Sequence, residues 1–87
     1  MKIKEGFVIR EIAGQSVVIA LGVAAKSYNG MIRLNETAKV IWQCLEKGLD
    51  REAIVETILS EYDVDRDLVE KDLDSFINTL KGANVIE

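Results

Sequence analysis

The stretch Gly30-Met31-Ile32-Arg33-Leu34-Asn35 decides the fold, because the spacing of the apolar residues changes there from that of strands to that of helices. Ile32 and Leu34 share one face of an extended chain, as in a strand with one buried side. Asn35 then supplies a side chain that commonly caps the first turn of a helix. The stretch therefore predicts a short strand at 30–34 that runs directly into a helix.

The residues before this point have the spacing of short strands. A glycine recurs every eight residues from position 6 to position 30, and the segments between are rich in β-branched side chains. We predict strands at 7–12 and 16–21, joined by a tight turn in which Gly14 takes a positive φ. The second segment is continuously apolar, which predicts a central strand covered on both faces. A loop at 27–29 leads to the third strand, which lies at an edge if the strands form a meander.

The residues after the third strand show helical periodicity. They contain no proline, and their apolar residues recur at intervals of three and four. Each of three such patterns begins at a residue suited to an N-cap, and glycines stand where the patterns stop. A short terminal strand at 85–86 completes the prediction. The predicted caps are Asn35, Asp50 and Asp65, and the predicted stops are Gly48 for the first helix and Gly82 with Asn84 for the third.

The fold class that follows is α+β. Eighty-seven residues suffice for one small domain with one core, so we predict a single domain over 1–87. It has a sheet half at 1–34 and a helical half at 35–87. The expected architecture is a three-stranded antiparallel sheet followed by three helices, similar to a winged helix-turn-helix.

The composition excludes most catalytic chemistry. The chain has no histidine, which removes the Ser-His and Cys-His dyads and most zinc sites. Its lone Cys44 cannot form an internal disulfide and fits a reducing compartment. The acidic run from Asp63 to Asp74 resembles a calcium loop but has Leu68 where such loops need glycine. We expect no enzyme activity, no metal and no cofactor.

Charge and hydropathy bear on the class of partner. The third predicted helix carries more acidic than basic residues, and the chain has a net charge of −4. Because DNA affinity comes largely from basic groups at phosphates, nucleic acid is not the expected partner. The longest apolar stretch, 17–25, is far shorter than the roughly 20 residues that span a bilayer, and the N-terminus does not read as a signal peptide. These features predict a cytoplasmic protein that binds neither nucleic acid nor membrane.

A peptide-binding groove is the remaining candidate. The third strand has unpaired backbone groups at its free edge, and Arg33 is its only obvious charged residue that would discourage pairing with another chain. The third helix carries Leu68 and Phe76 on a flank that also holds Asp72 and Thr79. An extended peptide could add to the strand in the groove beside this helix. The alternative is that Leu68 and Phe76 simply complete the core.

The helical half resembles the PqqD-like family. The run Leu34-Asn35-Glu36-Thr37-Ala38, followed by Ile41-Trp42, is similar to that family's L-N-x-T-A-x-x-I-W pattern. A second pattern, D-(V/L)-x-x-F-(I/L)-x-x-L, is matched over 72–80. Asn84 stands where the family commonly has a glycine, and asparagine tolerates the same left-handed backbone. The sheet half resembles the family in length and pattern only.

This resemblance implies a recognition element for ribosomally made, modified peptides. Such modules bind the leader segment of a precursor peptide as an added strand and present it to a modifying enzyme, frequently a radical S-adenosylmethionine enzyme. The binding residues that it implies here lie on the third strand and the third helix: Met31, Ile32, Arg33, Leu34, Leu68, Asp72, Ser75, Phe76 and Thr79.

Two other functions remain open at this point. One is a DNA-binding regulator of the winged-helix type, which the acidic third helix disfavours. The other is a structural subunit that forms a homodimer through its edge strand.

Overall fold

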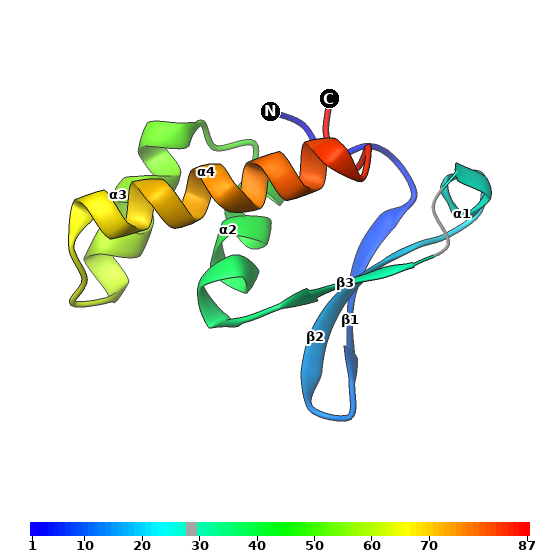
Figure 1. Cartoon of the computed structure of the whole chain (residues 1–87), viewed down its shortest axis with the longest axis horizontal. Coiled ribbons are helices and arrows are strands. Elements are labelled where there is room, and N and C mark those ends of the chain that lie inside the picture. The colour runs from blue at the N-terminus through cyan, green and yellow to red at the C-terminus, as the bar shows by residue number, and fades with distance from the viewer. Residues whose placement is uncertain (28–29) are drawn as a thin grey trace.

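The computed structural model describes residues 1–27 and 30–87 and contains a sheet followed by helices (Figure 1). The predicted α+β class, with a three-stranded antiparallel sheet in the first half, is confirmed. The elements in chain order are β1 (Phe7–Ile12), β2 (Gln15–Ala20), α1 (Ala24–Ser27), β3 (Met31–Leu34), α2 (Glu36–Glu46), α3 (Arg51–Glu61) and α4 (Arg66–Gly82).

The sheet has the order β1-β2-β3, so β3 is an edge strand within the described part of the chain. Both pairings are antiparallel, and Ile9, Val18 and Ile32 lie opposite one another on a single face. These three side chains belong to or pack against the core, and we call their side the inner face. The other side, the outer face, carries Val8, Arg10, Ile12, Gln15, Val17, Ile19, Met31 and Arg33.

The prediction that β2 is covered on both faces holds at its centre. Val18 on the inner face and Val17 on the outer face are both buried, with 1% and 3% of their surfaces exposed. The two residues are buried in different surroundings, because Val18 is part of the hydrophobic core cluster and Val17 is not. Val17 has Arg10 and Arg33 as its direct cross-strand neighbours.

The hairpin between β1 and β2 contains a strained residue. The two residues of its loop, Ala13 and Gly14, both have positive φ values, +52° and +79°. A two-residue turn of this kind matches the twist of the strands but favours Asn-Gly, because a Cβ is unfavourable in the left-handed region.

We therefore expect Ala13→Asn to raise the free energy of unfolding by about 1 kcal/mol, since asparagine tolerates this backbone. Urea denaturation followed by the fluorescence of the single tryptophan, Trp42, measures the change. Ala13→Val is the matched control and should destabilise, because a β-branched residue is poorly tolerated at positive φ. Equal stability of the two variants would contradict the assignment of strain to this turn.

One helix was not predicted. A short turn of helix, α1, occupies Ala24–Ser27. The sequence predicted no helix between the second and third strands, only a loop at 27–29. Gly6 explains how it packs, since a Cβ there would stand 2.8 Å from the Cβ of Ala24 and 2.9 Å from the carbonyl oxygen of Leu21. The rest of the predicted loop, Tyr28 and Asn29, lies outside the described residues.

The three long helices begin close to the predicted caps. The Asn35 side chain accepts a hydrogen bond from the amide of Ala38 at 2.8 Å, and that of Asp50 accepts one from the amide of Ala53 at 2.9 Å. Asp65 is correctly placed before α4, but its side chain makes no capping hydrogen bond. At the other ends, Gly48 follows α2 with a φ of +79°, and Asn84 follows α4 with a φ of +62°.

The core joins residues of the sheet and of the three long helices. Trp42 of α2 is its largest fully buried side chain, in a cluster made mostly of aliphatic residues. Figure 1 shows α2, α3 and α4 gathered on one side of the sheet and the two termini close together. The buried apolar members are Phe7, Val18, Leu34, Ala38, Ile41, Trp42, Cys44, Leu45, Ile54, Val55, Ile58, Val69, Leu73, Ile77, Leu80, Val85 and Ile86.

The chain ends pair with each other. The amide of Lys4 donates to the carbonyl oxygen of Val85 at 2.8 Å, and the amide of Glu87 donates to that of Lys2 at 2.9 Å. The predicted terminal strand is therefore a single isolated bridge between Ile3 and Ile86. None of the helices in the described ranges has the length and apolar character needed to span a membrane.

Candidate functional site

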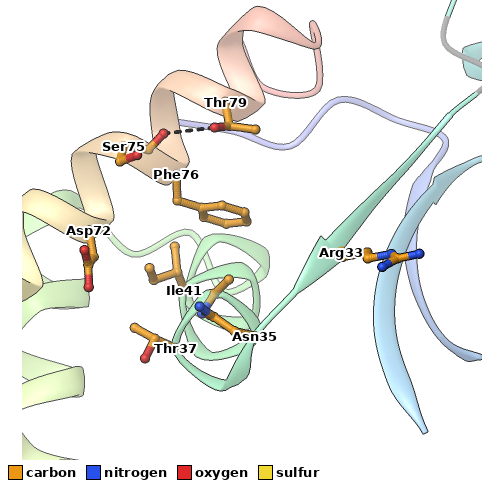
Figure 2. Close-up of a pocket in the computed structure, with 9 residues that line it drawn as sticks. Arg33, Asn35, Thr37, Ile41, Asp72, Ser75, Phe76 and Thr79 are labelled. Carbon is orange, nitrogen blue, oxygen red and sulfur yellow. Dashed lines mark hydrogen bonds between the residues drawn. The ribbon is translucent and has the colours of Figure 1, made fainter.

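A cavity of about 280 Å³ lies between the end of β3, the first turns of α2 and one face of α4 (Figure 2). Its walls combine apolar side chains with hydroxyl, amide and carboxylate groups. The residues that line it are Arg33, Asn35, Thr37, Ala38, Ile41, Asp72, Ser75, Phe76 and Thr79.

The α4 wall is one face of the helix. Asp72, Ser75, Phe76 and Thr79 are spaced at i, i+3, i+4 and i+7, which brings their side chains into one row. The Thr79 hydroxyl donates to the carbonyl oxygen of Ser75 at 3.1 Å, which holds that side chain against the helix (Figure 2). Phe76 is half-buried and packs against the core, whereas the three polar residues are exposed. The face thus presents one aromatic ring among polar groups.

The opposite wall comes from α2, which sequence reasoning did not include in the site. Ile41 and Ala38 are buried core residues whose surfaces also line the cavity. Asn35 and Thr37 stand at the rim, and the cap formed by Asn35 fixes the first turn of α2 beside the end of β3. The sequence contains a signal for this wall, because no linker separates the third strand from the Asn35 cap. The first turn of the helix therefore begins beside the end of the strand.

The predicted strand residues face different environments. Leu34 has 4% of its surface exposed and belongs to the core, and Ile32 is half-buried against the core. Met31 and Arg33 are exposed on the outer face. Arg33 is the only one of the four to line the cavity, and Figure 2 shows its guanidinium turned away from the helical residues. Their common feature is a backbone at the free edge of the sheet.

Leu68 lies one turn before Asp72 on α4 but does not line the cavity. Its side chain is 52% exposed, so it does not complete the core. Of the two alternatives for Leu68 and Phe76, core packing applies in part to Phe76 and not to Leu68. Leu68 extends the α4 face beyond the cavity as an exposed apolar side chain.

Ion pairs join α4 to α3, but one acid of the site has no ion-pair partner among the described residues. Arg51 of α3 donates two hydrogen bonds to Asp74, at 2.9 and 3.0 Å, and its guanidinium lowers the pKa of that carboxyl. Arg66 at the start of α4 pairs with Glu52, Glu56 and Glu70. Asp72 forms no ion pair with any described residue, so its carboxylate is available at the rim of the cavity.

The site has no constellation typical of catalysis. No group of three metal-ligating side chains occurs among residues 1–27 and 30–87. Cys44 is buried in the core. What the arrangement offers is an unpaired strand edge next to a cavity with an apolar floor.

Comparison with known proteins assigns the family. The family model described as coenzyme PQQ synthesis protein D (PqqD) matches residues 9–86. The chain belongs to the PqqD family. The resemblance seen in the helical half is thereby confirmed, and the match extends into the sheet half. A comparison with curated proteins gave no significant match.

Two solved structures resemble this PqqD-family chain. One is TbiB1 in complex with the TbiA(beta) leader peptide: the identity is 33%, the TM-score is 0.80, and the match covers all of this chain and 95% of that one. The other is lasso peptide synthetase B1 complexed with the leader peptide, with 24% identity, a TM-score of 0.75 and coverage of 98% and 93%. The second shares the fold.

Proposed function

We propose that the chain binds the leader segment of a ribosomally synthesised precursor peptide by adding it as a strand to the free edge of β3. The observation that carries the proposal is the position of that edge beside the cavity floored by Ile41 and Phe76. The likeness to TbiB1, solved with a leader peptide, supports it. Backbone pairing would hold the peptide, and one of its apolar side chains would enter the cavity.

The size of the site agrees with moderate affinity. Each backbone hydrogen bond contributes about 0.5–1.5 kcal/mol net, and one buried apolar side chain contributes about 1.5–3 kcal/mol. Ordering the peptide offsets part of this gain. Micromolar to sub-micromolar binding is therefore expected.

In this proposal the chain takes no chemical part in the modification. Holding the precursor close to a separate modifying enzyme raises the effective concentration of the substrate. A radical S-adenosylmethionine enzyme is the proposed partner class. The Asp72 carboxylate, which is not ion-paired within the described residues, would favour a leader with a polar or basic residue next to its apolar anchor.

Titration of the isotopically labelled chain with the leader of the precursor peptide encoded beside it tests the function. We expect amide shift changes along β3, along 72–79 of α4 and in the first turn of α2, because these segments border the cavity. A leader of the same composition in scrambled order is the control and should leave the spectrum unchanged. Shift changes that avoid both β3 and α4 would contradict the proposal.

The free edge of β3 also favours a second candidate, a homodimer formed by pairing of two β3 strands. Sedimentation over a range of concentrations distinguishes the two. A peptide-binding edge should be free in a monomer at low concentration and should stay monomeric once the leader is bound. A dimer that persists at low concentration and excludes the leader would favour the structural role.

A further inference from the structure

The outer face of the sheet has the composition of a contact surface. Its apolar residues are Val8, Ile12, Val17, Ile19 and Met31, and none of them belongs to the core cluster or packs against it. Val17 at the centre is buried, and Val8 and Ile19 are half-buried. Ile12 and Met31 are 48% and 52% exposed. A sheet face of this kind, made of neighbouring apolar side chains, is more apolar than an ordinary solvated face, on which polar residues alternate with the buried ones.

The charges on this face are all of one sign. Arg10 and Arg33 flank Val17 on the two neighbouring strands and are exposed. The acid nearest in sequence, Glu11, points to the inner side, where it accepts a hydrogen bond from Ser16 and pairs with Lys39. The outer face is therefore positive although the chain has a net charge of −4.

The two arginines also differ from the others in the chain. Arg51 and Arg66, on the helices, are each held by carboxylates. Arg10 and Arg33 form no ion pair within residues 1–27 and 30–87, and Arg10 donates only to the carbonyl oxygen of its neighbour Ile9. Arginine is enriched at the centre of protein interfaces, where its planar fork binds carboxylates.

We propose that the outer face is the docking surface for the modifying enzyme, which meets it with an apolar patch bearing carboxylates. This inference rests on the proposed function, because it names the surface through which the bound precursor is delivered. Leader and enzyme would use different parts of the sheet: the leader pairs with the backbone at the β3 edge, and the enzyme contacts the outer face, with Arg33, which also lines the cavity, standing between the two. Both can therefore be bound at once.

The size of the face predicts a transient contact. The six-residue strands β1 and β2 are about 20 Å long and the four-residue β3 is about 13 Å long, so at a spacing of about 4.8 Å the face covers roughly 250 Å². A stable interface buries about 800 Å² on each partner. Docking through this face is therefore weak alone and becomes effective when the precursor bridges the two proteins.

Charge argues against two other occupants. A second copy facing the first through this surface would bring four arginines together without a carboxylate of the outer face to offset them. Nucleic acid would meet two arginines on a chain that is otherwise acidic, which is too few cations for tight phosphate binding. An acidic, partly apolar protein surface is the complement of what the face presents.

A pair of variants at one position tests the sign of this complementarity. The probe is the purified modifying enzyme encoded beside the precursor gene, titrated into the labelled leader-free chain. Ile12→Asp and Ile12→Lys both remove an exposed apolar side chain at the end of the hairpin, but they add opposite charges. We expect Ile12→Asp to weaken enzyme binding by at least tenfold and Ile12→Lys to weaken it less. Equal losses, or the reverse order, would overturn the proposal.

A second substitution separates this surface from a general charge effect. Arg10 lies on β1, which β2 separates from the β3 edge. We therefore expect Arg10→Glu to weaken enzyme binding at least tenfold and to change leader affinity by no more than about twofold. Lys2→Glu makes the same change in charge at an exposed site outside the sheet and should have little effect. Equal weakening of enzyme binding by Arg10→Glu and Lys2→Glu would overturn the docking surface. Amide shifts on adding the enzyme that are confined to β3 and α4 would also overturn it. If the wild-type chain self-associates or binds DNA, and Arg10→Glu abolishes that binding, the assignment of the face to the enzyme is likewise overturned.

The two proposals fail in different measurements. Wild-type chain that binds the enzyme through β1 and β2 but binds no leader would refute the leader-binding function alone. Wild-type chain that binds leader but shows no shifts on β1 and β2 with the enzyme, whether or not leader is present, would refute the docking surface alone.

Discussion

Trp42→Ala is expected to lower the free energy of unfolding by about 3–5 kcal/mol, the usual cost of deleting a large aromatic side chain from a core. Trp42 is fully buried, with 0% of its surface exposed, and belongs to a core cluster made mostly of aliphatic residues. A domain of this size has a total stability of only about 4–13 kcal/mol, so the variant would be close to unfolding at ordinary temperature.

Trp42→Phe is the informative control. The indole Nε1 of Trp42 has no hydrogen-bond partner in the part of the chain that the structure describes. Phenylalanine loses some volume but also removes a buried, unsatisfied donor, which itself costs about 1–3 kcal/mol. The net loss should therefore be about 1 kcal/mol or less. Urea denaturation followed by far-UV circular dichroism measures both variants. Equal losses for Trp42→Ala and Trp42→Phe would contradict the assignment of the indole N–H as a costly, unsatisfied donor.

The second large effect is on peptide binding. We expect Phe76→Ala to weaken leader affinity by roughly 10- to 100-fold, because it removes the apolar surface worth about 1.5–3 kcal/mol on the α4 side of the cavity. Lys81→Ala, which removes an exposed charge outside the cavity, should change affinity by less than about twofold. Isothermal titration with the leader peptide measures both.

Phe76 also packs against the core, so folding must be checked separately. Circular dichroism and urea denaturation of Phe76→Ala show whether the fold is kept. Ser75→Trp provides a second route to the same result, since Ser75 is exposed at the cavity and a large ring there fills the space without touching the core. Retained affinity in both variants would show that the peptide does not use this cavity.

Several parts of the fold could be predicted because they depend on neighbouring residues. The strand at residues 31–34, the cap at Asn35 and the left-handed Asn84 all follow from the preferences of a few consecutive residues. The same preferences failed at α1, whose position depends on contact with Gly6 about twenty residues earlier. Local patterns do not contain such long-range contacts.

The sequence predicted the α4 wall of the candidate site and Arg33 of β3, but not the α2 wall. The face of α4 with Asp72 and Phe76 was found from helical spacing and from the family pattern, and the structure places it along the cavity. Ile41 was assigned to the core alone, because its spacing is that of a buried stripe. Ile41 also lines the cavity although only 1% of its surface is exposed, because α2 begins directly after β3 and faces α4 across the cavity.

The amino-acid sequence alone determined the order of the three strands and the three long helices, the caps that begin α2 and α3, the acidic character of α4 and the membership of the PqqD family. These properties are set by periodicity, charge and local backbone preference within short segments. Only the tertiary structure decided that α2 forms the second wall of the cavity and that two arginines on the outer face form no ion pair with any residue that the structure describes. Such arrangements arise from the packing of surfaces far apart in the chain, and no short segment encodes them.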